Sequence, residues 1–174
     1  MEQVVSYDNF FSYPPSLGGE YSKDQTYNAG IFSLEKDLVF RAELTCVEGD
    51  FFKPSVFEPS EYGIILFLRC NGCPDRRLYF TRNIENDIIN LFQHGFPPTS
   101  KKVYNKKSLD NRLVKLRGNN EFKILFIDGK WDFSINGRNI VEGYDALGPV
   151  QECNLGVFVD KTNVVKTVHY EVWN

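Results

Sequence analysis

The segment Phe122–Val159 reads FKILFIDGKWDFSINGRNIVEGYDALGPVQECNLGVFV. It begins with two runs in which apolar and polar residues alternate, the pattern of a strand with one buried face. Asp128-Gly129 joins these runs and Asn136-Gly137 follows the second, and both dipeptides favour the positive-φ conformations of tight hairpin turns. A third apolar run opens at Leu155. We predict a twisted antiparallel meander here, onto which the rest of the chain folds.

The composition favours strands over helices. The chain has 174 residues, which suits one domain with a sizeable core. Aromatic residues make up 15% of it, with 15 Phe and 9 Tyr but one Met. Aromatic side chains are enriched in strands, so this content supports a β-rich domain.

Further strand-like runs recur along the chain, separated by turn-forming residues and without a convincing helical period. We therefore predict an all-β protein of about eight to ten strands, an antiparallel β-sandwich of the jelly-roll type. The predicted strands outside the opening segment are Leu38–Cys46, Gly63–Cys70, Arg76–Asn83, Asp87–Phe92 and Val164–Trp173, with a short strand from Val114 to Gly118.

The N-terminal region differs in composition from the rest. It is rich in Tyr, Ser, Gly, Pro and Asn, with Pro14-Pro15 and Gly18-Gly19 as breakers. We expect residues 1–29 to form an extended arm packed on the domain of residues 30–174. Either Val4–Tyr7 or Phe10–Tyr13 would supply an edge strand. The start of the chain lacks a basic and an apolar signal region, and no run reaches about 18 apolar residues, so we expect a cytoplasmic protein without a membrane span.

The four cysteines favour burial over chemistry. Cys46, Cys70 and Cys153 lie within apolar runs, where a free cysteine acts as a small hydrophobic residue. Cys70 and Cys73 have the spacing of a metal-ligand pair, but a structural zinc site needs four ligands and no second pair exists. A redox role for this pair would need a helix N-terminus, whereas Asn-Gly between the cysteines indicates a hairpin tip. We expect no metal and no cofactor.

Positive charge is concentrated in one segment of an otherwise acidic chain. The net charge of −3 argues against nucleic-acid binding. Lys101–Arg117, however, holds seven basic residues and one acidic residue, a local charge of +6. The segment is interpreted either as a solvated loop or as a patch that faces an anionic partner. Its basic residues are Lys101, Lys102, Lys106, Lys107, Arg112, Lys115 and Arg117.

The opening segment contains four short motifs in order: Phe122-Lys123-Ile124, the Asn136-Gly137 turn after Phe133, Gly148-Pro149 and Leu155-Gly156-Val157. These motifs resemble the C-terminal half of a galectin domain, and the order of the elements over residues 30–174 resembles that of galectins, the S-type lectins. This resemblance implies a galectin or concanavalin-like sandwich that binds β-galactosides in a groove across one sheet.

The sugar-reading motif of that family is missing. Galectins carry His-x-Asn-x-Arg on one strand, so that alternate side chains point into the groove. They also supply a stacking Trp followed by Gly-x-Glu. An Arg–Glu pair orients sugar hydroxyls by charge-assisted hydrogen bonds that neutral groups do not replace. The residues at the matching places, which we predict to bind ligand, are Tyr79, Thr81, Asn83, Asn90, Tyr104 and Lys107.

Two functions remain open on this basis. The first is glycan binding with altered, anionic specificity, because the +6 segment adjoins the polar strand. The second is a protein-interaction module that has lost sugar binding and contacts an acidic protein surface through its basic and aromatic residues. We do not predict an enzyme, because neither His94 nor His169 has the context of a catalytic site.

Overall fold

In the computed structural model, the chain is described for residues 1–10, 25–47, 61–69, 76–84, 87–95, 101–107, 113–145, 150–159 and 165–174. These residues form twelve β-strands, and no helix that could span a membrane occurs among them. The strands are β1 Gln3–Phe10, β2 Gln25–Ser33, β3 Leu38–Val47, β4 Glu61–Arg69, β5 Arg76–Asn83, β6 Ile88–Gly95, β7 Lys101–Lys107, β8 Arg117–Ile127, β9 Lys130–Ile135, β10 Arg138–Tyr144, β11 Glu152–Val159 and β12 Val165–Trp173.

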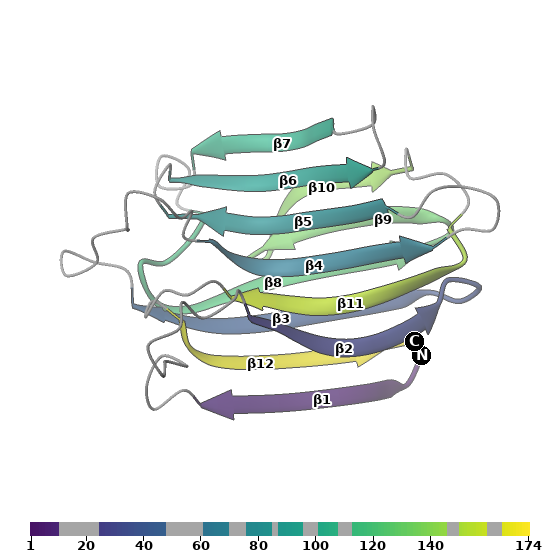
Figure 1. Cartoon of the computed structure of the whole chain (residues 1–174), viewed down its shortest axis with the longest axis horizontal. Helices are drawn as coiled ribbons and strands as arrows, with labels where there is room; N and C mark the ends of the chain where they lie inside the picture. The colour runs from purple at the N-terminus through teal and green to yellow at the C-terminus, as the bar shows by residue number, and fades with distance from the viewer. Residues whose placement is uncertain are drawn as a thin grey trace.

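Two six-stranded antiparallel sheets lie face to face (Figure 1). One sheet, the β8 sheet, has the strand order β1-β12-β3-β8-β9-β10. The other, the β5 sheet, has the order β2-β11-β4-β5-β6-β7. The predicted antiparallel β-sandwich is therefore confirmed.

The core lies between the two sheets and is built by alternation along each strand. In β8, Phe122, Ile124 and Phe126 are buried while the residues between them are partly exposed. The ring of Phe80 from the β5 sheet meets Phe122 and Phe133 edge-on, with centroids 5.4 Å apart in each pair. These contacts fix the two sheets against each other through aromatic packing.

Both predicted hairpin turns of the opening segment are present. Asp128 and Gly129 have φ values of 50° and 77°, and Asn136 and Gly137 have values of 49° and 76°. Two successive positive-φ residues define the type I′ turn, whose twist matches the flanking strands. The β8-β9-β10 meander follows from these turns.

The third run of that segment belongs to the other sheet, so the predicted meander was wrong in this part. The strand after the Asn-Gly turn is β10, whose residues are mostly exposed and show no alternation. The run at Leu155 is β11, which crosses to the β5 sheet between β2 and β4. Its core-facing residues are buried there because β11 lies between β2 and β4 and its inner face packs against the β8 sheet.

The N-terminal region supplies strands to both sheets. β1 pairs with β12 at an edge of the β8 sheet, in register with residues 167–173. β2 pairs with β11 in the β5 sheet, so the boundary expected at residue 30 lies inside a strand. Tyr7 of β1 stacks on Tyr170 at a centroid distance of 4.8 Å and lies 5.9 Å from Tyr27 of β2.

The basic segment is partly a strand rather than a loop. Residues 101–107 form β7, the edge of the β5 sheet, and pair with β6. Lysines are typical of edge strands, where their charge opposes pairing with a further chain. The predicted short strand from Val114 to Gly118 is also wrong, because β8 begins only at Arg117.

The side chains of Asn120 and Asn136 form hydrogen bonds with the backbone of residues 113–115, which precede β8. The amide of Asn120, fully buried, accepts a hydrogen bond from Lys115 N (2.8 Å) and donates one to Lys115 O (2.7 Å). Asn136 Nδ2 donates to Asn120 Oδ1 (2.8 Å) and to Leu113 O (2.9 Å). The hairpin turn and residues 113–115 are thereby held together.

Two of the predicted buried cysteines lie in the core. Cys46 and Cys153 are fully buried as free thiols. Burial raises the pKa of the Cys153 thiol to about 12, which keeps it protonated and unreactive at neutral pH. Cys70 and Cys73 lie outside the described residues.

Candidate functional site

The outer face of the β5 sheet carries the residues predicted to bind ligand. Alternation along β5 sends Leu78 and Phe80 into the core and places Tyr79, Thr81 and Asn83 on the opposite face. The structure thus brings three of the predicted residues onto one side of one strand.

Two of these residues are held by the carboxylate of Glu61, a residue that the sequence did not single out. Glu61 of β4 lies in register with Asn83. Its Oε1 accepts a hydrogen bond from Asn83 Nδ2 (2.9 Å), and its Oε2 accepts one from Thr81 Oγ1 (3.3 Å). Thr81 is 0% and Asn83 5% exposed, so both side chains are covered and fixed in orientation.

Asn90 continues this polar row onto the next strand. It is half-buried in β6 and lies in register with Thr81. In β7 the residue in register with Asn90 is Asn105, whereas Tyr104 is in register with buried Leu91. Tyr104 therefore lies one position along β7 from the residue that pairs with Asn90.

The structure describes only part of the remaining predicted ligand-binding and basic residues. Lys107 is in register with Ile88 of β6, and the side chains of β7 lie outside the described residues, including Lys101, Lys102 and Lys106. Arg112 also lies outside them. Lys115 and Arg117 are exposed just before and at the start of β8.

An aromatic row lies beside the polar row on the same face. Tyr79 is in register with Phe92 of β6, and Phe67 of β4 is in register with Arg77 of β5. The Arg77 guanidinium sits 5.2 Å from the centroid of the Phe67 ring, a cation–π contact. Tyr79, Phe67 and Phe92 are each half-buried.

The backbone beneath this face is closely packed at Gly63. This residue is in register with Thr81 and has a φ of 153°. A Cβ built there would lie 2.2 Å from the carbonyl oxygen of Phe80, which a real side chain cannot tolerate. The glycine therefore permits the close approach of β4 and β5 that sets Glu61 against Thr81 and Asn83.

Two polar contacts brace β5 and β6 behind the candidate face. Arg82, 1% exposed, donates to Asp87 Oδ1 at 2.5 Å. Tyr144 of β10 donates its hydroxyl to Gln93 Oε1 at 2.7 Å and so links the two sheets. Burial raises the pKa of Tyr144, with Asp145 raising it further and Arg76 opposing, so the hydroxyl stays a donor at neutral pH.

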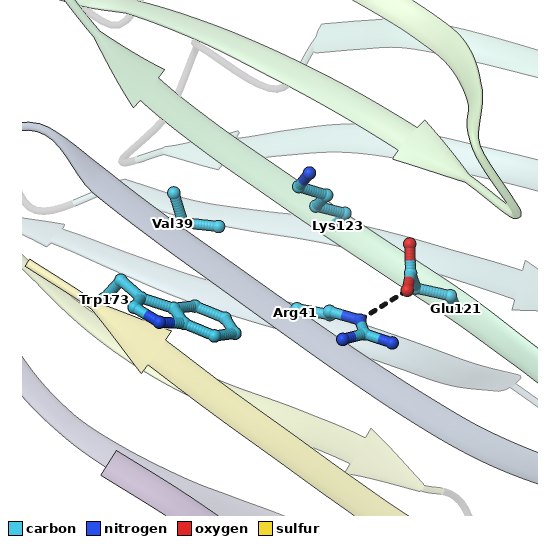
Figure 2. Close-up of a pocket in the computed structure, with 5 residues that line it drawn as sticks. All are labelled: Val39, Arg41, Glu121, Lys123 and Trp173. Atoms are coloured by element: carbon cyan, nitrogen blue, oxygen red, sulfur yellow. Dashed lines mark hydrogen bonds and ion pairs between the residues drawn. The ribbon is translucent and has the colours of Figure 1, made fainter. Parts of the chain in front are cut away.

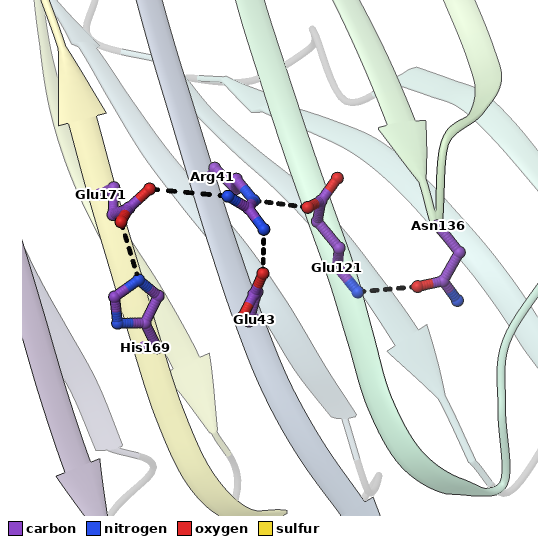
Figure 3. A network of polar contacts seen from close by, with 6 residues as sticks. All are labelled: Arg41, Glu43, Glu121, Asn136, His169 and Glu171. Carbon is purple, nitrogen blue, oxygen red and sulfur yellow. Dashed lines mark hydrogen bonds and ion pairs between the residues drawn. The ribbon is translucent and has the colours of Figure 1, made fainter.

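The opposite outer face, on the β8 sheet, holds a network of charges (Figure 3). Arg41 of β3 donates to Glu121 of β8 and to Glu43, and lies 3.6 Å from Glu171 of β12. His169 Nε2 lies 3.1 Å from Glu171 Oε1. Partial burial lowers the pKa of Arg41, but the hydrogen bond to Glu121 and the charges of the three carboxylates outweigh it, so the pKa is raised.

Sequence reasoning missed this network, although its signal is present. The charged residues alternate with buried ones in β3, β8 and β12, and only the pairing of these three strands reveals that they share a face. The same alternation, followed back from Gly63, would have placed Glu61 on the outer face of β4. Within the described ranges, no group of three His, Cys, Asp or Glu residues is arranged to hold a metal ion.

Comparison with known proteins bears on the fold. No family model and no curated protein matches the chain. A carbohydrate-binding module from Bacillus subtilis superposes with a TM-score of 0.51 at 10% identity, over 96% of this chain and 92% of that one. Sheep galectin-11, solved with glycerol, has a TM-score of 0.47 and 10% identity, and the match covers 87% of this chain and 99% of that one. Chicken galectin 2 has a TM-score of 0.46 and 12% identity, and the match covers 84% of this chain and 99% of that one.

The structures found include galectins, as the resemblance in the sequence predicted. At these low identities the similarity concerns the arrangement of strands. It leaves the residues of each outer face to be judged by their own chemistry.

Proposed function

We propose that this chain is a non-catalytic glycan-binding module whose ligand lies on the outer face of β4, β5 and β6. The observation that carries the proposal is the pairing of a polar row with an aromatic row on that face. Tyr79 and Asn90 are half-buried on this face, and hydrogen bonds to Glu61 hold the side chains of Thr81 and Asn83 in place.

The chemistry of this face suits a sugar. A sugar ring presents C–H groups on its faces and hydroxyls around its edge. The Tyr79 ring offers a flat surface for the former, and the Asn90 amide offers both a donor and an acceptor for the latter. The solved neighbour with the highest TM-score quoted above is by its name a carbohydrate-binding module, which supports the same class of ligand.

Specificity is expected to differ from that of a lectin for neutral β-galactosides. Of the outward positions of β5, Tyr79, Thr81 and Asn83 carry a phenol, a hydroxyl and an amide, and the cationic Arg77 lies over the Phe67 ring at the other end of the strand. The neighbouring strand β7 contains four lysines in seven residues. A cationic edge beside the face favours uronic-acid or sulfated glycans by electrostatic attraction.

An NMR titration tests this proposal. We expect a panel of sulfated and uronic-acid oligosaccharides to shift backbone amides within residues 79–90 more strongly than neutral β-galactosides do. Asn90→Ala should weaken binding about tenfold through the lost hydrogen bonds. Asn119→Ala is the matched control, because Asn119 is an exposed residue of β8, in the other sheet. Shifts confined to other regions, or none, would refute the assignment.

A protein-interaction module is the second candidate. Phe67, Tyr79 and Arg77 gather on one face, and Tyr and Arg are the residue types most enriched among binding hot spots. Recovery of an acidic protein from native lysate that is lost on Arg77→Ala, while glycans fail to bind, would favour this function over the first.

A further inference from the structure

A hollow lies on the outer face of the β8 sheet, on the other side of the sandwich from the proposed glycan site (Figure 2). Its volume is about 350 Å³, toward the small end of ligand sites in proteins. Three adjacent strands supply its lining. The lining residues are Val39, Arg41, Glu121, Lys123 and Trp173.

Strand register arranges these residues in an apolar row and a charged row. Trp173 of β12 is opposite Val39 of β3, and two residues along β3, Arg41 is opposite Lys123 of β8. Two residues span about 7 Å along a strand, and three strands span about 10 Å across a sheet. A ligand with one apolar face and a polar edge would match this layout.

The Arg41 guanidinium is held in place before any ligand binds. Arg41 is held from three sides by Glu121, Glu43 and Glu171. Figure 2 shows the Trp173 indole beside Arg41, with Glu121 on the far side of the guanidinium. Groups fixed in this way lose little conformational freedom on binding, which lowers the cost of recognition.

Two donors in the hollow have no partner within the described part of the chain. The Lys123 ammonium and the Trp173 indole N–H take part in no hydrogen bond or ion pair there. Glu121 supplies carboxylate oxygens as acceptors beside them. The hollow therefore offers unused donors and an acceptor around an aromatic surface.

The balance of charge indicates which ligand class fits. Arg41 and Lys123 face Glu121, with Glu43 and Glu171 close behind, so neither sign dominates. A strongly anionic ligand would meet three carboxylates, and a cationic one would meet Arg41 and Lys123. We propose that this hollow binds the ring of a neutral sugar, which stacks on Trp173 and bonds through its hydroxyls to Lys123, Arg41 and Glu121.

This site goes beyond the proposed function and does not depend on it. The two faces belong to different sheets and point away from each other (Figure 1). A chain with both sites would bind a neutral glycan on one side and an acidic glycan on the other. It would then link two glycan chains without forming an oligomer.

Tryptophan fluorescence tests the second site directly. Trp131 is buried in the core, so Trp173 is the indole that a ligand on the β8 sheet would reach. Titration with neutral gluco-, galacto-, manno- and xylo-oligosaccharides should produce a saturable change in emission with at least one of them. Trp173→Ala should weaken that binding about tenfold or more, measured by calorimetry. Lys123→Gln should weaken it severalfold, as expected for a lost charge-assisted hydrogen bond.

A matched variant tests whether the effect is confined to the hollow. Asn119→Ala changes an exposed residue of β8 outside the hollow and should bind normally. If Trp173→Ala binds as the unmodified chain does, or no neutral sugar changes the emission, the inference is wrong even where acidic glycans still bind through Asn90. Binding of uronic-acid or sulfated sugars in place of neutral ones at Trp173 would overturn the ligand class.

Discussion

Replacing Asn120 with alanine should remove the side-chain hydrogen bonds that join the β8-β9-β10 meander to the residues that precede it. The fully buried side chain takes part in three hydrogen bonds, two with the backbone of Lys115 and one with Asn136. Each such bond is worth about 1 kcal/mol net, and a polar group left without a partner costs about 1–3 kcal/mol. Because Lys115 is exposed and water can reach part of its backbone, we expect a loss of about 3 kcal/mol for the variant.

That loss is large against the stability of an ordinary domain, about 5–15 kcal/mol. Urea unfolding followed by far-UV circular dichroism should show a lower midpoint with an unchanged slope. For a chain of this size, the melting temperature should fall by about 6–12 °C. Asn119→Ala is the control, since this exposed neighbour on the same strand should change stability by no more than about 0.5 kcal/mol. A loss below about 1 kcal/mol for Asn120→Ala would show that these hydrogen bonds contribute little to the free energy of unfolding.

Three further predictions concern stability. Gly63→Ala should cost about 3 kcal/mol or more in urea unfolding, because its Cβ would meet the Phe80 carbonyl oxygen, and a variant of normal stability would contradict the close approach. Asp87→Ala should lower stability by about 2 kcal/mol by removing a carboxylate partner of the buried Arg82 guanidinium, and a variant of normal stability would contradict that contact. Stability should fall as pH rises from 9 to 12, because folding raises the pKa of Cys153, and Cys153→Ala should flatten this slope by up to about 1.4 kcal/mol per pH unit. An unchanged slope in that variant would argue against the buried thiol.

Local patterns were sufficient to predict much of the fold. Asp-Gly and Asn-Gly fix type I′ turns through backbone sterics alone, and the alternation in β8 and β9 fixes their buried face. β10 escaped prediction because it lies at the edge of a sheet, where neither face is fully buried and no alternation is required. β7 escaped for a related reason, since its lysines are as typical of a solvated loop as of an edge strand.

The sites were less predictable because they depend on register between strands that are distant in sequence. Tyr79, Thr81 and Asn83 could be placed on one face from β5 alone. The contribution of Glu61, however, follows only from the pairing of β4 with β5. The network around Arg41 likewise needs the order β12-β3-β8, in which strands from the two ends of the chain meet. Alternation predicts which residues share a face, and tertiary pairing decides which of them meet.

A glycan array, read at low and at physiological salt and followed by equilibrium titration of each positive ligand, tests the glycan-binding proposal most directly. We predict saturable binding of at least one acidic glycan that weakens as salt increases and falls about tenfold in Asn90→Ala. Signals at background for every glycan at both salt concentrations would contradict the proposal and leave the outer face of β4, β5 and β6 as a surface for a protein partner.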